Sequence, residues 1–220
     1  TNFRNNGQGV WLGYNFDRHK IGLSLDRYKL STQTWFDDPE GQFDDFSVKI
    51  PKLEREKIGL FYDYAADGDY LKNIHVDAYS QTIERKFENR VKTTQVIPSP
   101  MIKALTVSNQ TNTNDKQYTQ GVTLQSNFSL PANNELVIGT QYQHDKIKQD
   151  TDGSTRQTAA TGFFDTQTRT LSYNEAEQSN TSLFAQNDWR FADDWTWTVG
   201  ARQYWLSSKL KRNDTQTLQS

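Results

Sequence analysis

The sequence lacks cysteine, and no long apolar run occurs in its 220 residues. Without cysteine, disulfide bonds, thiolate metal sites and cysteine nucleophiles are excluded. No apolar segment approaches the roughly 18 residues that a membrane-spanning helix requires. Hydrophobic residues make up only 34% of the chain, against roughly 45% in a typical water-soluble domain. The mean hydropathy of −0.89 therefore argues against a conventional globular core.

The sequence also has no large excess of positive or of negative charge. The net charge is −2, and lysine and arginine form no block, so nucleic acid is excluded as a partner. The motifs Gly-x-Ser-x-Gly and His-Glu-x-x-His and a phosphate-binding glycine loop are absent as well. Neighbouring carboxylates such as Asp37-Asp38 stand in polar segments typical of solvated surface. The sequence thus predicts a protein that is not an enzyme.

Aromatic residues are plentiful at 13%, and they lie in segments where apolar and polar residues alternate. In residues 123–142, Leu124, Phe128 and Leu130 share one parity, and the pattern restarts after a turn at 131–134. Alternation on both sides of a Pro/Asn turn predicts a β-hairpin. Similar hairpins are predicted around turns near residues 18, 67 and 193. On the strand before the last turn, the pattern does not decide whether Leu183 or Phe184 belongs to the apolar face.

Between these hairpins lie polar segments at roughly 29–55, 86–116, 147–180 and from 207 onward. Short turns at one end and long connections at the other are typical of outer-membrane barrels and rare in compact soluble domains. We therefore predict an all-β fold, a segment of an antiparallel transmembrane β-barrel with short periplasmic turns and long extracellular loops. It would contribute about eight consecutive strands to a larger barrel.

Several aromatic residues stand beside the short turns, where their rings would form an interfacial girdle. They are Phe16, Tyr64, Tyr70, Phe128, Phe191 and Trp195. The opposite parity carries polar residues such as His75, Asp77 and Gln125, which we expect to face a wet lumen or a plug. The chain starts at Thr1 and stops at Ser220 within polar sequence, so we expect it to be a piece of a longer protein.

Two stretches resemble a known family. The stretch 181–206, TSLFAQNDWRFADDWTWTVGARQYWL, is similar to the mid-barrel signature of TonB-dependent outer-membrane receptors. The matching positions are Phe184, Ala185, Gln186 and Trp189, then Gly200, Ala201 and Arg202, with the family's tyrosine displaced to Tyr204. The stretch 50–91 resembles the haem, haemoglobin, transferrin and lactoferrin branch. That likeness is carried by Pro51-x-Leu53-x-Arg55, the Tyr62 strand and Tyr79-x-Gln81.

The resemblance implies a 22-stranded barrel in the bacterial outer membrane, closed by an N-terminal plug. Residues 1–220 would be part of that barrel domain, with the plug and the barrel's C-terminus outside the sequence. The implied function is TonB-dependent uptake of an iron source, foremost haem or a haem- or iron-carrying protein. The implied partners are outer-membrane lipid, the TonB complex through the missing N-terminal region, and possible exploitation by a colicin or a phage. No cofactor is expected beyond the transported haem or iron chelate.

Candidate ligand-binding residues are sought in the predicted extracellular loops. His144, near the loop end of its strand, is a candidate ligand of haem iron. Exposed loop aromatics are typical contact anchors, and these are Trp35, Phe36, Phe163, Phe164 and Tyr173. The alternative is that these rings pack within their own loops. His19 is given no role, His75 is expected to be a polar lumen residue, and residues 150–154 predict a turn rather than a calcium site.

Other functional classes stay open at this point. A siderophore receptor, or a passive porin-like channel without a plug, would show the same alternation. A soluble β-rich binding module would require a second apolar face, which the sequence does not offer. An outer-membrane hydrolase with a serine and a histidine near the barrel rim is the enzyme alternative.

Overall fold

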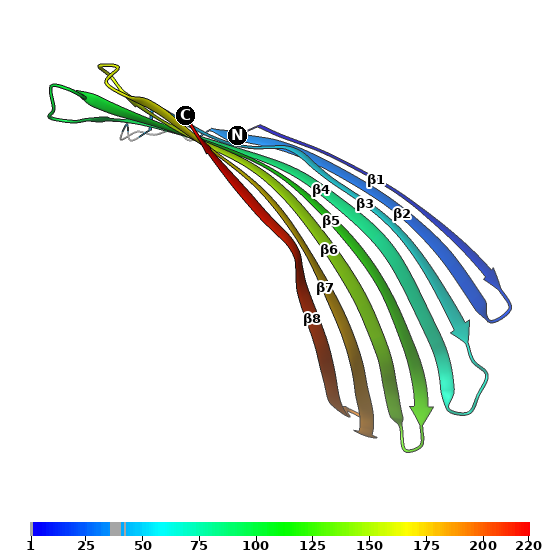
Figure 1. Cartoon of the computed structure of the whole chain (residues 1–220). Helices are drawn as coiled ribbons and strands as arrows, with labels where there is room; N and C mark the ends of the chain where they lie inside the picture. Colours follow the sequence, from blue (N-terminus) through cyan, green and yellow to red (C-terminus); the bar gives the residue numbers. More distant parts are fainter. Residues whose placement is uncertain (1, 36–40, 42) are drawn as a thin grey trace.

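The computed structural model describes residues 2–35, 41 and 43–220, which form one eight-stranded antiparallel sheet (Figure 1). Each strand pairs with its neighbours in chain order, without crossovers. The strands are β1 (Asn2–Phe16), β2 (His19–Trp35), β3 (Asp45–Ala65), β4 (Leu71–Val96), β5 (Ala104–Leu130), β6 (Asn134–Ala159), β7 (Asp165–Ala192) and β8 (Trp195–Gln219). The prediction of eight antiparallel strands is confirmed. In the part of the chain that the structure describes, no helix is long and apolar enough to cross a membrane.

Four short turns join the strands at one end of the sheet, at the predicted positions (Figure 1). In the turn between β5 and β6, Ala132 and Asn133 both adopt left-handed backbone conformations, with φ of 60° and 58°. Two such residues in succession give the twist that an antiparallel hairpin needs. The side-chain amide of Asn134 donates a hydrogen bond of 2.9 Å to the carbonyl of Pro131 and holds the turn.

The segments predicted as long connections continue instead as paired strands. β4 to β7 are 26–28 residues long, so only residues 97–103 and 160–164 remain outside strands at those two tips. Polar side chains occupy both faces of these extensions, so hydropathy alternation gives no strand signal there. Antiparallel pairing nevertheless satisfies the backbone hydrogen bonds, and threonine-rich sequence is compatible with strands. The sheet therefore reaches far beyond its apolar half.

Register and alternation divide the half of the sheet near the short turns into two faces. The apolar face carries every second residue, in aligned rows such as Leu12–Leu23–Leu60–Ala78–Val122. Leu183, which is 52% exposed, lies on this face, and Phe184 lies on the other. The opposite, polar face carries the alternate residues, including Asp77 and Thr123. The uncertainty about the parity of β7 is thereby resolved.

The sheet is a single layer over the described residues. Only Gly22, Thr119, Gly121, Ala159 and Ser182 are buried there. Apolar residues such as Leu12, Leu60 and Val199 remain more than half exposed on the apolar face. A soluble sandwich would cover such a face with a second sheet. The described residues supply no such cover, so the apolar face requires another environment.

A β-bulge interrupts β3 at Pro51. The register between β3 and β4 shifts between Lys49 and Lys52, and that between β2 and β3 shifts between Leu30 and Thr32. Proline has no N–H to give to the ladder and is found in sheets at edges or bulges. The extra residue reverses the parity of β3 beyond this point and opens the sheet surface next to Ser31.

Candidate functional site

Aromatic rings gather on the apolar face beside the short turns. His19 stacks between Phe16 and Tyr64, with ring centroids 4.9 and 5.0 Å apart. Its Nδ1 also forms a hydrogen bond of 2.8 Å with the hydroxyl of Tyr62. Such rings, apolar on their faces and polar at one edge, suit the boundary between an apolar and an aqueous phase.

A second aromatic group occupies the turn between β7 and β8. Trp189 and Trp197 are register partners, and Phe191 lies 5.5 Å from Trp189 and 6.4 Å from Trp195 between ring centroids. Trp195 and Trp197 are more than 60% exposed. The predicted girdle therefore has a structural counterpart at this end of the apolar face.

On the polar face, aromatic rings cover glycines. The ring of Tyr79 occupies the space that a β-carbon at its register partner Gly121 would need. Phe61 covers Gly22 in the same way. Glycine at these positions lets a large ring lie against the sheet surface.

Asp145 of β6 is the centre of a polar network on this face. It accepts hydrogen bonds from Thr119 (2.5 Å), Gln143 (2.8 Å) and Gln117 (3.3 Å). The hydroxyl of Tyr79 donates to Gln143 over 3.4 Å. The network joins β4, β5 and β6 across the polar face. Sequence analysis missed it, although the polar residues at alternate positions from 117 to 123 and 141 to 145 were its signal.

Arg202, from the 181–206 signature, also lies on the polar face. Its guanidinium donates to Ser182 over 2.9 Å and to Gln141. The guanidinium carbon lies 5.1 Å from the ring centroid of Phe184 and 4.9 Å from that of Tyr204. The signature residues thus form one contact group across β6, β7 and β8.

His75 occupies the polar face, where sequence analysis expected it. Its Nδ1 lies 2.6 Å from a carboxylate oxygen of Asp63, and its ring is 6.4 Å from that of Phe61. Among the described residues, no group of three or more histidine, cysteine, aspartate or glutamate side chains could hold a metal ion. His75 therefore contacts Asp63 and Phe61 and belongs to no such metal-binding group among the described residues.

The tips of two long hairpins touch each other at the far end of the sheet. Thr161 in the β6–β7 connection donates to the backbone carbonyl of Met101 in the β4–β5 connection, and the amide of Ala160 donates to the carbonyl of Ala104 over 2.9 Å. Figure 1 shows these tips side by side at the upper left, in green and yellow. Met101 and Phe163 are 54% and 60% exposed there.

The other candidate residues divide between tips and strands. Phe163 and Phe164 lie in the β6–β7 tip, with their rings edge to face at 6.5 Å. Trp35 is the last residue of β2, and Phe36 lies outside the described residues. Of these, only the Phe163–Phe164 pair is seen to form a loop cluster.

Tyr173 and His144 lie within strands rather than in loops. Tyr173 of β7 donates a hydrogen bond of 2.9 Å to Glu175, and the guanidinium of Arg212 lies 4.9 Å from its ring centroid. His144 of β6 shares the parity of Tyr142, and its Nδ1 is 2.9 Å from the hydroxyl of Ser179. His144 therefore lies on the side of the sheet that carries the apolar face.

The stretch 150–154, predicted as a turn, is part of β6. There Asp152 pairs with Arg169 of β7 at 2.7 Å, and this guanidinium lowers the pKa of the Asp152 carboxyl. Threonine and arginine partners in the neighbouring strand outweigh the local turn preference of Asp and Gly.

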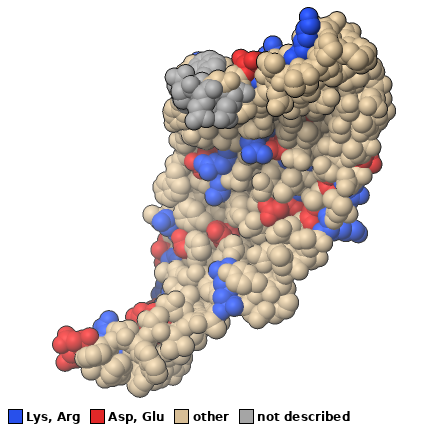
Figure 2. Space-filling model, turned by 90° about the vertical axis from the view of Figure 1, so that its left-hand side faces the viewer, with Lys and Arg blue, Asp and Glu red and all other residues tan. Residues whose placement is uncertain are grey.

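A charged belt follows the apolar face on the same side of the sheet, directly beyond its last apolar residues. Its first members are Arg27, Lys29, Lys52, Glu54, Glu84 and Lys116, and further along are Lys146, Glu175, Glu177 and Lys211. Figure 2 shows acidic and basic side chains interspersed over the face in view. Sequence analysis missed this belt because it spans seven strands and is contiguous only once their register is known.

Two carboxylates of the belt, Glu54 and Glu84, each bind more than one cation. Glu54 contacts Arg27 at 2.5 Å, Lys29 at 3.1 Å and Lys52 at 3.4 Å, and these cations, Arg27 foremost, lower its pKa to about 2. Glu84 contacts Lys116 at 2.7 Å and Lys52 at 2.5 Å, which lower its pKa to about 2. Both carboxylates are therefore ionised at neutral pH.

Comparison with known proteins places this geometry in context. A family model described as TonB dependent receptor-like, beta-barrel matches residues 1–220. The siderophore receptor PiuA from Acinetobacter baumannii is 11% identical with a TM-score of 0.42, over 94% of this chain and 39% of that one. The copper transporter OprC is 9% identical with a TM-score of 0.32, over 93% of this chain and 53% of that one. No curated protein matches.

The chain thus spans well under two thirds of either solved structure. The family match covers all of its residues, including the 181–206 signature around Arg202. With its two-faced meander of eight antiparallel strands, the chain belongs to the TonB-dependent receptor-like β-barrel family.

Proposed function

We propose that this chain forms part of the wall of a bacterial outer-membrane receptor that imports an iron source with energy delivered through TonB. The observation that carries the proposal is the division of one sheet into an apolar face without a second layer and a hydrogen-bonded polar face. Lipid accommodates the first and a plugged, wet lumen the second. The family and the fold are those of transport receptors rather than of enzymes.

The proposed ligand is haem or a protein that carries haem or iron. The resemblance of residues 50–91 supports this choice, and so does the reach of the long hairpins. From Ser80, at the end of the apolar rows, β4 runs 16 more residues to Val96, or roughly 50 Å along the strand. Small ligands are enclosed in pockets, whereas exposed aromatic anchors such as Phe163 are typical of protein contacts. The tips therefore suit a macromolecular ligand, and a colicin or phage would meet them as well.

His144 is the candidate ligand of haem iron within this proposal. Because its Nδ1 lies against the Ser179 hydroxyl, its Nε2 is the atom that would bind the iron. The test is a haemin titration of the full-length receptor in detergent, followed at the Soret band. We expect a single saturable site that is lost in His144→Ala and retained in His75→Ala, whose histidine lies on the polar face. Unchanged binding in His144→Ala would remove this residue from the proposal.

Energy coupling separates the leading function from its alternatives. A strain that depends on this receptor for iron should grow on haemoglobin only when TonB is present. Growth without TonB would favour a passive porin-like channel. Growth on a ferric siderophore, with no Soret change on addition of haemin, would favour a siderophore receptor.

A further inference from the structure

Two adjoining hollows lie across β1, β2 and β3, where the apolar face gives way to the charged belt. The first has a volume of about 850 Å³, and its charged lining consists of Arg4, Arg27, Lys29, Lys52 and Glu54. The second has a volume of about 460 Å³, and its lining combines the apolar Val10, Leu25 and Ile58 with the charged Asp26, Arg27, Glu56 and Lys57. Gln8 and Arg27 line both. A charged hollow thus borders a hollow with a partly apolar lining.

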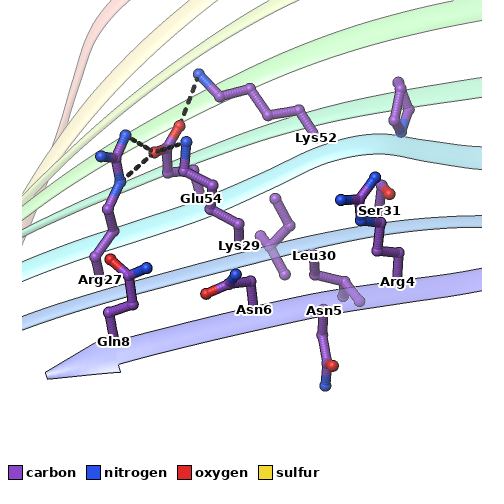
Figure 3. Close-up of a pocket in the computed structure, with 12 residues that line it drawn as sticks. Arg4, Asn5, Asn6, Gln8, Arg27, Lys29, Leu30, Ser31, Lys52 and Glu54 are labelled. Carbon is purple, nitrogen blue, oxygen red and sulfur yellow. Dashed lines mark hydrogen bonds and ion pairs between the residues drawn. The ribbon is translucent and has the colours of Figure 1, made fainter.

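The first hollow exists because of the bulge in β3. Pro51 and Ser31 stand where the ladder between β2 and β3 loses its register, and both line the hollow. Figure 3 shows Arg27, Lys29 and Lys52 converging on Glu54, while Arg4 lies beside Ser31. The unbroken register of β1 and β2 pairs Arg4 with Ser31, which keeps this arginine on the side of the belt.

Cationic side chains outnumber carboxylates in and around the first hollow. Glu54 binds three of the four cations that line the hollow, whereas Arg4 makes no ion pair among the described residues. Two carboxylates outside the first hollow also pair with its cations, since Glu56 contacts Arg27 and Glu84 contacts Lys52. The count is then four cations to three carboxylates. The hollow therefore favours an anion, and Arg4 and Lys29 offer donors that their neighbours leave accessible.

The position of the first hollow along the strands matches the level of the lipid headgroups. Arg27 and Lys29 follow the apolar residue Leu25 by two and four positions on the same parity of β2, or roughly 7 and 13 Å along the strand. The polar headgroup layer begins where the hydrocarbon ends and adds several ångströms on each side of a bilayer. Basic side chains at this level attract anionic lipids.

We propose that the paired hollows bind a phosphorylated lipid of the outer leaflet. Its phosphate lies among Arg4, Arg27 and Lys29, and an acyl chain lies against Val10, Leu25 and Ile58. The site rests on the proposed function for its place in the membrane. Its occupant is the lipid that surrounds the receptor, distinct from the nutrient that the receptor imports.

The test uses the full-length receptor in detergent, incubated with diphosphorylated lipid A or with its dephosphorylated form. Lipid retained after gel filtration is quantified by mass spectrometry. We expect the phosphorylated form to be retained selectively, and retention to fall about tenfold in Arg4→Gln/Lys29→Gln. Both substitutions leave Glu54 with Arg27 and Lys52, so the belt stays paired. The matched control is Lys20→Gln/Arg55→Gln, which removes two cations of the opposite parity of β2 and β3 that line neither hollow.

Three outcomes would overturn the proposal. Equal retention by the double variant and wild type would show that the hollow does not hold the lipid. Equal retention of the dephosphorylated form would exclude phosphate recognition. Displacement by inorganic phosphate alone, at concentrations similar to the lipid's, would assign the hollow to a free anion. The haemin titration of the same preparation reports on the proposed function separately, so failure of one does not imply failure of the other.

Discussion

Phe184 of β7 and Gly139 of β6 are register partners, and the phenyl ring fills the space that a β-carbon at Gly139 would need. The backbone carbonyl of Leu124 closes the other side of that space, 2.7 Å from the position of the missing atom. Arg202 covers the outer face of the ring. Glycine is therefore required here by close approach of the backbone as well as of a side chain.

Gly139→Ala should destabilise the receptor by about 1–3 kcal/mol, because the added methyl overpacks against a carbonyl that cannot rotate away. Urea-induced unfolding in lipid vesicles measures this change. The matched control is Gly153→Ala on the same strand, where the nearest atom to a new β-carbon is 3.8 Å away. A loss of stability as large in Gly153→Ala would show that glycine serves backbone flexibility rather than packing.

The Phe184–Gly139 pair also shows why sequence left the parity of β7 open. Phe184 and Leu183 are both apolar, so hydropathy alone cannot say which belongs to the apolar face. The deciding residue is Gly139, which lies 45 positions away in sequence and is paired only in the folded sheet. Strand number, turn positions and the apolar face depend on local alternation, and these were predicted. Contacts set by register between strands were not.

The two faces should place tryptophans in different environments. Trp197 lies on the apolar face and is 62% exposed, whereas Trp11 lies on the polar face against Gly13. In receptors that retain only one of these tryptophans, brominated lipid should quench the fluorescence of Trp197 strongly and that of Trp11 weakly. Acrylamide, a quencher dissolved in water, should show the opposite order. Equal quenching of both by brominated lipid would contradict the assignment of the faces.

The charged belt should make stability depend on acid pH. The folded-state pKa of Glu54 is lowered to about 2 by Arg27, Lys29 and Lys52. A depressed pKa contributes stability that is complete above the unfolded value near 4.5 and is lost as the pH falls toward 2. Wild type should therefore lose thermal stability over this interval, and Glu54→Gln should lose less. Glu88→Gln is the control, since Glu88 makes no ion pair among the described residues.

If Glu54→Gln followed the wild-type curve through this interval, the ion pairs around Glu54 would have no thermodynamic weight. Salt provides a second check, because pairs this exposed are partly screened. Raising the ionic strength should reduce the difference between wild type and variant.

The long strand extensions mark the limit of sequence-based prediction in this fold. Residues 86–96 and 104–116 carry polar side chains on both faces, so they resemble loop sequence although they pair over their full length. Tyr173, expected in a loop, consequently lies within β7, and His144, expected near the loop end of its strand, lies in the middle of β6. Phe163 and Phe164, expected in the connection 147–180, do lie outside the strands, in the β6–β7 tip, where Gly162 adopts a φ of 76°.

The tips give the last prediction, on ligand binding. Met101→Ser/Phe163→Ser should weaken binding of haemoglobin by about tenfold or more, because two exposed apolar anchors of neighbouring tips are removed at once. Both side chains are exposed, so the variant should unfold at the same urea concentration as wild type. The matched control is Tyr70→Ser, an exposed aromatic at the opposite end of the sheet. Biolayer interferometry with immobilised haemoglobin and the full-length receptor in detergent measures all three proteins. Equal affinity of variant and wild type would move the protein-binding surface away from the tips, whereas an equal loss in Tyr70→Ser would show that the measurement reports surface hydrophobicity rather than a specific contact.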